Sequence, residues 1–164
     1  AVKTKIPGEP DATRMLIGVF EGVLPCADCE GIRTELTLYQ DVANADNNSY
    51  ILKETYLGVN TGDTTFTSKG KWDVLKGTKA DAGASVFFLN YDKPDASKYY
   101  LKEDDTTIVM LDKEQNKINT PLNYTLRKRK IPGIHAFLIA NAVNSNYFYT
   151  IFFSCIRFVL KSML

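Results

Sequence analysis

The chain has 164 residues, a length that suits one domain, and its 20 Lys and Arg residues against 19 Asp and Glu leave a net charge of +1. This balance excludes an overall electrostatic field that would draw the protein to nucleic acid or to anionic lipid. Aromatic residues make up 12% of the sequence, and with the abundant Thr, Val and Ile they favour an all-β class, because such side chains fit a pleated, half-buried surface.

The chain opens on a polar stretch. Residues 1–14 hold Lys, Thr, Pro, Gly, Glu and Asp without apolar periodicity, so they cannot bury enough surface to order themselves and are predicted to form a tether. The first residues do not combine a positively charged start with an apolar core and a small-residue cleavage site. We therefore expect any export signal to have been removed or never to have existed.

From Met15 onward, short runs of β-forming residues are separated by turn residues, the pattern typical of a meander. Closely linked runs of this kind should pair antiparallel, and closing them on themselves removes exposed edges. We predict a small antiparallel β-barrel over residues 15–130, with six to eight strands and under two turns of helix. The expected strands lie near residues 15–23, 32–40, 49–58, 64–74, 84–91, 97–103, 106–112 and 122–129. Alternation predicts that one face of the strand near 32–40 carries Ile32, Thr34, Leu36 and Leu38. In the same way, one face of the strand near 49–58 should carry Tyr50, Leu52, Glu54 and Tyr56.

Two of the three cysteines lie between the first two expected strands, as Cys26-Ala-Asp-Cys29, whereas Cys155 is distant. This spacing indicates a short disulfide, a metal site or redox chemistry, and an oxidising compartment would favour the disulfide. As thiolates the pair would match Cu(I), which needs few soft ligands, or part of a Zn²⁺ site, which needs about four. Cys26 and Cys29 are therefore the candidate metal ligands, with Cu(I) as the candidate cofactor. A short disulfide between them remains the alternative.

A thioredoxin-type enzyme is the third interpretation of the cysteine pair. Such enzymes place the motif at the start of a helix whose dipole lowers the pKa of the thiol, but here a strand is expected to follow. Asp28 and Glu30 would disfavour a thiolate by their like charge, and beside Gly31 they are more typical of a turn than of a metal site. Met15 and Met110 could add thioether ligands, although isolated methionines in strands are usually core residues.

The expected barrel interior has two interpretations. Trp72 is predicted to plug it, and a group of aromatic side chains could line a cavity for a small apolar ligand, although small barrels are often filled by their own side chains. We expect a filled interior and keep a carrier of a small apolar ligand as an alternative function. The aromatic group comprises Phe87, Phe88, Tyr91, Tyr99 and Tyr100.

After Lys130 the composition changes. Residues 131–164 contain no Asp or Glu and are dense in Ile, Phe, Tyr, Asn and Leu. Asn141, Asn144 and Arg157 are among the residues that interrupt the apolar run, so a membrane-spanning helix is not expected. The frequent residues of this tail are specified by A/T-rich codons. Such a composition fits out-of-frame or vector-derived translation as well as it fits native sequence. We predict that it is dispensable for the barrel fold.

The sequence shows no catalytic arrangement. His135 is the single histidine and lies in the tail, so the expected barrel has no histidine base for a Ser-His-Asp or Cys-His arrangement. Neither Gly-x-Ser-x-Gly nor a phosphate-binding loop occurs. We expect a binding or sensing module with no catalytic residue, not an enzyme, and keep a thiol-disulfide redox protein as the enzymatic alternative.

The segment from Phe20 to Ile32 reads Phe-Glu-Gly-Val-Leu-Pro-Cys-Ala-Asp-Cys-Glu-Gly-Ile and is followed by Thr34, Leu36 and Leu38. It resembles the signature that opens the N-terminal domain of the NlpE family. Later landmarks resemble those of the family in the same order, so that the resemblance covers about residues 15–129. They are Tyr56-Leu-Gly58, Gly70-Lys-Trp72, Met110-Leu-Asp112 and Asn123-Tyr-Thr-Leu126.

The resemblance implies a lipocalin-like β-barrel on an outer-membrane lipoprotein that faces the periplasm and serves copper homeostasis and envelope stress sensing. It marks Cys26 and Cys29 as the metal or redox site. It also implies partners among the envelope proteins of signalling or lipoprotein sorting, and a membrane attachment through an N-terminal lipid anchor. The lipidated cysteine is absent from this sequence, so the anchor is an inference. Some members have a second β-domain where this chain has its tail, and the functions of that domain are not carried over.

Overall fold

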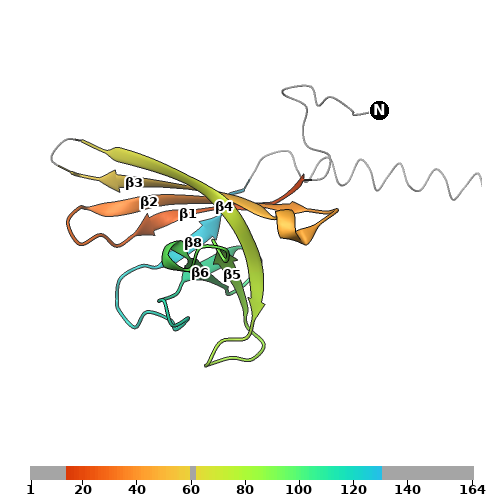
Figure 1. Ribbon diagram of the computed structural model, residues 1–164. Coiled ribbons are helices and arrows are strands. Elements are labelled where there is room, and N and C mark those ends of the chain that lie inside the picture. Colours follow the sequence, from red (N-terminus) through yellow and green to blue (C-terminus); the bar gives the residue numbers. More distant parts are fainter. Residues whose placement is uncertain (1–13, 60–61, 131–164) are drawn as a thin grey trace, which may run out of the picture. The chain divides into compact units, whose positions relative to one another are not determined.

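The computed structural model of the protein describes residues 14–59 and 62–130. There each strand pairs antiparallel with the next, and β8 pairs with β1 to close a barrel (Figure 1). The described residues hold no helix beyond two short 3₁₀ turns, η1 (Ala45–Asn47) and η2 (Pro94–Ala96), and thus none long and apolar enough to cross a membrane. The predicted all-β antiparallel meander is confirmed. Its strands are β1 (Arg14–Leu24), β2 (Gly31–Asp41), β3 (Ser49–Leu57), β4 (Thr64–Lys76), β5 (Ser85–Leu89), β6 (Lys98–Lys102), β7 (Thr107–Met110) and β8 (Thr125–Lys128).

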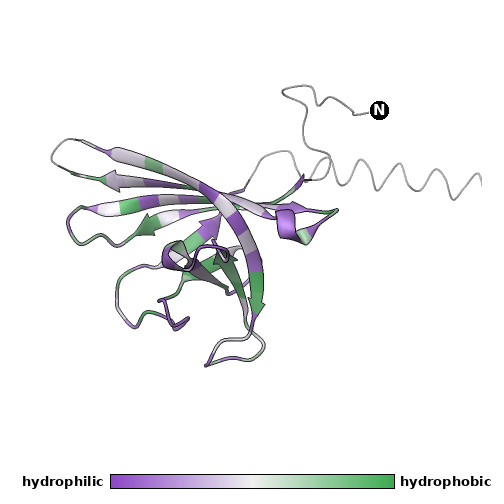
Figure 2. Cartoon of the chain, viewed as in Figure 1, coloured by the Kyte–Doolittle hydropathy of each residue, from purple (hydrophilic) through white to green (hydrophobic). Residues whose placement is uncertain are grey.

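Alternation along the strands decides which side chains face the barrel interior. On β2, Thr34, Leu36 and Leu38 are fully buried, as the period of two predicted. Arg33, the residue before Thr34, is exposed on the other face. A β-bulge around Ile17 shifts the register of β1 against β2. Figure 2 shows the resulting mixture of hydrophobic and hydrophilic residues along the long strands, which is typical of a sheet with one wet face.

Side chains from around the barrel fill its interior, as expected. Trp72 is buried, and its indole N–H donates to the carbonyl oxygens of Tyr39 at 2.9 Å and Ser49 at 3.1 Å. Its ring packs edge-on against Phe87, with 5.5 Å between the ring centroids. The predicted plug is therefore confirmed, and its polar atom is satisfied. The core cluster consists of Phe20, Leu24, Leu36, Leu38, Tyr50, Leu52, Trp72, Phe87, Leu89, Tyr100, Ile108 and Leu126.

The aromatic group expected around the interior divides between two faces of the sheet. Phe87 and Tyr100 belong to the core. Phe88 and Tyr99 pair across β5 and β6 on the opposite face, where their rings stack with centroids 4.7 Å apart. Tyr91 lies beside Phe88, at 6.4 Å between centroids. The idea that all five could line the interior was wrong for these three. Phe88 and Tyr99 are neighbours of core residues along their strands and so point to the opposite face, and Tyr91 lies beyond the end of β5.

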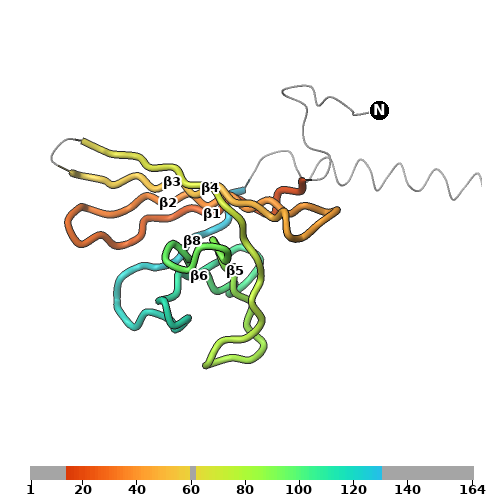
Figure 3. Tube along the Cα trace, in the orientation of Figure 1, coloured from red at the N-terminus to blue at the C-terminus, as the bar shows by residue number. Residues whose placement is uncertain are grey.

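β4 has two different partners along its length. Its first part, from Thr64 to Lys71, pairs with β3, and its second part, from Trp72 to Lys76, pairs with β5. The β3–β4 hairpin and the adjacent β1–β2 hairpin therefore extend past the short strands β5 and β6 (Figure 3). This division leaves the end of the sheet that holds the cysteine loop outside the filled part of the barrel.

Candidate functional site

The predicted cysteine pair lies in the loop between β1 and β2. Cys26 and Cys29 form a disulfide with 5.3 Å between their Cα atoms, and both residues are half-buried. Of the alternatives left open by the sequence, the structure has the short disulfide. In this oxidised state neither sulfur is a thiolate, so the loop presents no soft metal ligand until it is reduced.

The cysteine loop is attached to the neighbouring hairpin. The backbone N–H of Glu30 donates to the carbonyl oxygen of Leu57 at 3.0 Å. The Glu30 side chain covers Gly58, where an added Cβ would lie 2.5 Å from the Glu30 side chain. Gly58 has a φ of +66°, which a residue with a side chain rarely adopts, so glycine is required there on both counts. These contacts fix the base of the loop against β3 and leave Ala27 and Asp28 exposed at its tip.

The donor set around the loop is small. Among residues 14–59 and 62–130, no group of three or more His, Cys, Asp and Glu side chains could hold a metal ion. A tetrahedral Zn²⁺ site, which takes about four ligands, therefore does not fit the described residues. Two thiolates from Cys26 and Cys29 fit Cu(I), which accepts few soft ligands, once the disulfide is reduced.

The two methionines considered as copper ligands are not supported in that role. Met15 is 49% exposed near the start of β1, about 30 Å along the strand from its end at Leu24. The expectation that it fills the core was wrong, because this end of β1 precedes the bulge and lies at the rim of the barrel. Met110 packs against the core cluster, as expected.

A polar cluster that the sequence analysis missed lies inside the barrel. The Lys98 ammonium and the Glu54 carboxylate form an ion pair at 2.6 Å, with both side chains largely buried. The Tyr100 hydroxyl is buried and makes no hydrogen bond to any residue that the structure describes. Burial, with the nearby Glu54 charge, raises the pKa of Tyr100, and burial also raises the pKa of Tyr50, so both phenols stay neutral. Alternation had placed Glu54 on the same face as Tyr50 and Leu52, but its partner Lys98, 44 residues along the chain, had no local signal.

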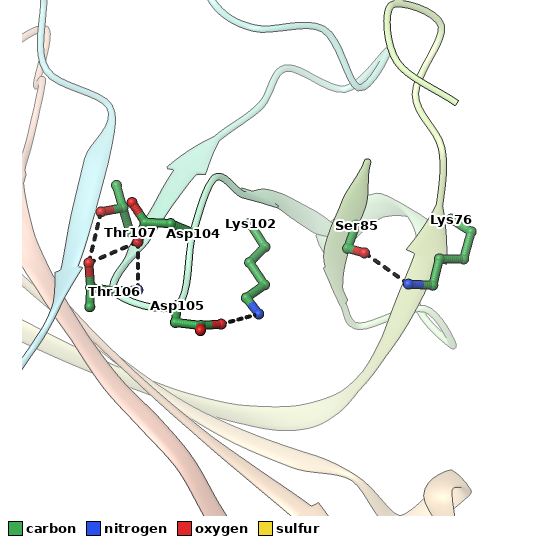
Figure 4. A network of polar contacts seen from close by, with 7 residues as sticks. All are labelled: Lys76, Ser85, Lys102, Asp104, Asp105, Thr106 and Thr107. Atoms are coloured by element: carbon green, nitrogen blue, oxygen red, sulfur yellow. Dashed lines mark hydrogen bonds and ion pairs between the residues drawn. The ribbon is translucent and has the colours of Figure 1, made fainter. Parts of the chain in front are cut away.

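The turn between β6 and β7 carries adjacent acidic residues whose carboxylates are already occupied (Figure 4). Asp104 accepts hydrogen bonds from the backbone N–H of Thr106 at 2.6 Å and from its hydroxyl at 2.8 Å, and these lower the pKa of Asp104. Lys102 pairs with Asp105 at 2.7 Å and lowers the pKa of that carboxyl. Each carboxylate is held ionised by its own partner, so the pair is not arranged for general acid-base chemistry.

Comparisons with known proteins match the same part of the chain. The family model described as the NlpE N-terminal domain matches residues 20–121, which include the cysteine loop. Lipoprotein NlpE of Escherichia coli (strain K12) is 34% identical over 125 residues, which are 76% of this chain and 46% of that protein. The chain thus spans about half the length of this relative. No solved structure matches the chain.

Proposed function

The chain belongs to the NlpE N-terminal domain family, and from this membership we propose that it is the barrel domain of a cell-envelope lipoprotein for copper homeostasis and envelope stress sensing. The Escherichia coli relative is a lipoprotein. The observation that carries the proposal is the Cys26–Cys29 pair, which lies within the matched range on a loop attached at its base to the end of β3.

The disulfide supports a location in an oxidising compartment, since disulfides persist in the periplasm and are rare in the cytosol. We place the domain on the periplasmic side of the outer membrane, attached through an N-terminal lipid anchor. Its partners in this proposal are envelope proteins of signalling or lipoprotein sorting. The near-neutral charge of the chain supports neither nucleic acid nor an anionic membrane surface as a partner.

In the proposed role the cysteine pair changes between two states. A dithiol reductant would exchange with the Cys26–Cys29 disulfide, becoming a disulfide itself and leaving two thiols on the loop. Loss of the two thiol protons then gives a dithiolate that can hold Cu(I). The backbone hydrogen bond from Glu30 to Leu57 does not involve the sulfur atoms, so in this proposal it holds that end of the loop in both states and lowers the ordering free energy that opposes binding.

The test is a Cu(I) competition titration of the full chain, reduced and kept without oxygen, against a chromophoric Cu(I) chelator. We expect one Cu(I) per chain, bound far more tightly than Mg²⁺ or Ca²⁺, because thiolates are soft ligands and those cations prefer oxygen. Cys26→Ser with Cys29→Ser should abolish tight binding, while Cys155→Ser, the matched control, should retain it. Unchanged stoichiometry and affinity in the double variant would exclude this loop as the copper site.

The filled interior does not favour the alternative of a lipocalin-like carrier, since twelve mutually packed buried side chains occupy the space that a ligand would need. The thiol-disulfide enzyme gains little support, because strand β2 and not a helix follows the cysteine loop. We therefore propose sensing by binding and oxidation state, without catalysis.

A further inference from the structure

The first half of β4 is an open sheet edge within the described part of the chain. From Thr64 to Lys71 the strand pairs with β3 on one side only. The Lys71 carbonyl accepts the Asn90 N–H on the β5 side, at 2.8 Å. Because a residue of an antiparallel strand directs its N–H and C=O to the same side, the alternate residues Thr65, Thr67 and Lys69 direct theirs to the unpaired edge. No described residue donates to or accepts from these backbone groups.

This edge has the composition of a pairing strand. Residues 65–69 are all exposed, and they are β-branched, aromatic or small except for Lys69. Phe66 is 59% exposed, although its ring packs perpendicular to the ring of Tyr56, with 5.7 Å between the centroids. Native sheets usually protect such an edge with several charges, a proline or a bulge, because it can template pairing with another chain.

We infer that the open edge of β4 pairs with the same edge of a second copy of this chain, antiparallel about a two-fold axis at Phe66. In this register Phe66 lies opposite Phe66 of the second copy. Thr65 lies opposite Thr67, and Asp63 opposite Lys69, each contact occurring twice by symmetry. The open-edge backbone groups of Thr65 and Thr67 then hydrogen bond across the axis.

The charges and the exposed apolar side chain of this edge indicate that its partner is a second copy of the chain, and they indicate the register of pairing. The segment is self-complementary, since Lys69 meets the carboxylate of Asp63, so a second copy fits it without any other partner. Facing phenylalanines occupy a non-hydrogen-bonded pair, where side chains approach most closely, and cover each other's exposed rings. An axis at Thr67 would also pair Asp63 with a lysine, Lys71. Each Phe66 would then lie opposite Ser68, however, and its ring would remain exposed to solvent. Because each chain has a net charge of only +1, two copies repel each other weakly.

One strand edge is a small interface, well below the ~1,000 Å² typical of a stable complex. The dimer is therefore weak and in concentration-dependent exchange. The fraction of chains in the dimer rises with the concentration of the protein. The two cysteine loops remain outside the paired edge.

The register is tested by mixing two cysteine variants of the full chain, Thr64→Cys and Ser68→Cys, each combined with Cys155→Ser. Thr64 faces Ser68 of the second copy with Cα atoms about 4.5 Å apart, within reach of a disulfide. Like residues are four positions apart along the strand, about 13 Å, and cannot be bridged. Mild oxidation should cross-link the mixture and neither variant alone. Cross-linking of single variants, or none in the mixture, would overturn the register.

The dimer itself is tested by sedimentation equilibrium of the full chain up to about 1 mM. The wild type should associate reversibly, and Phe66→Glu should be monomeric because it sets two carboxylates opposite each other. Val42→Glu, at a residue 62% exposed in the loop after β2, is the matched control and should associate like the wild type. Circular dichroism checks that both variants fold. A wild type that stays monomeric, or a Phe66→Glu variant that associates equally, would contradict the proposal.

Discussion

The filled body of the barrel and its projecting end are held by different interactions. In the body, Trp72 contacts Phe87 and two backbone carbonyls, and side chains of seven strands pack around it with almost no exposure. In the projecting end, which comprises the cysteine loop of residues 25–30 and the open half of β4, the loop is held by the Cys26–Cys29 disulfide, the backbone hydrogen bond from Glu30 to Leu57 and the packing of Glu30 over Gly58. Changes in the body should therefore have the largest effect on stability, and changes in the projecting end should have a smaller effect on stability and the main effect on binding.

The largest effect is expected in the body. Trp72→Ala should lower the free energy of unfolding by about 3–5 kcal/mol, because it leaves a cavity beside Phe87 and frees two carbonyl oxygens. Urea unfolding followed by circular dichroism measures the loss. Val42→Ala, on an exposed residue, is the control and should change stability by less than about 0.5 kcal/mol. A loss below about 1 kcal/mol for Trp72→Ala would contradict the described packing.

The next effect is smaller because the disulfide closes a short loop. Replacing Cys26 and Cys29 together with Ser should cost about 2 kcal/mol, the entropy of a loop of about four residues. The wild type with reductant should lose about the same amount in urea unfolding, while the double variant should not respond to reductant. If the double variant unfolded as readily as Trp72→Ala, the cysteine loop would belong to the body of the fold.

A third change should cost nothing, although it lies in the core. The buried Tyr100 hydroxyl has no hydrogen-bond partner among residues 14–59 and 62–130, so Tyr100→Phe removes an unsatisfied polar group and should leave stability equal or raise it by up to about 1 kcal/mol. Thermal unfolding of Tyr100→Phe beside Tyr50→Phe gives the comparison. A clear loss for Tyr100→Phe would mean that the hydroxyl is bonded, and the polar cluster would need another description.

The smallest expected effect is on the pH dependence of stability in acid. The pKa of Asp104 is lowered from 3.8 by the hydrogen bonds of Thr106, and a lowered pKa in the folded state adds stability above the unfolded pKa that is lost as pH falls through the folded one. Asp104→Asn should therefore leave the unfolding of the protein less sensitive to pH below about 4. Urea midpoints between pH 2 and 5 measure this, and identical acid profiles of variant and wild type would contradict it.

Much of the fold was accessible from sequence because its determinants are local. Runs of Val, Ile, Thr and Tyr between turn residues gave all eight strands, and the period of two gave the buried face of Leu36 and Leu38. Strict use of the same period would also have separated Phe87 from Phe88. The spacing of Cys26 and Cys29 predicted a short disulfide as one of three alternatives, and their state depends on the compartment, not on the sequence.

The remaining features depend on contacts between distant residues. The change of partner at Trp72, which frees the first half of β4, follows from barrel closure and has no signature in the strand itself. The pairing of Glu54 with Lys98 likewise joins strands β3 and β6. The predicted tether lies outside the described residues except for Arg14, which begins β1. The predicted tail, residues 131–164, lies outside them entirely.

In the proposed role, function resides in the cysteine pair of the projecting end while the body stays unchanged. The most direct measurement is a thiol count on reduced, anaerobic full-length chain, with and without one equivalent of Cu(I). All three cysteines should react without copper, and only Cys155 should react with it, at an unchanged circular dichroism spectrum. Three reactive thiols in the presence of Cu(I), with Cys26 and Cys29 labelled as fast as Cys155, would contradict the claim.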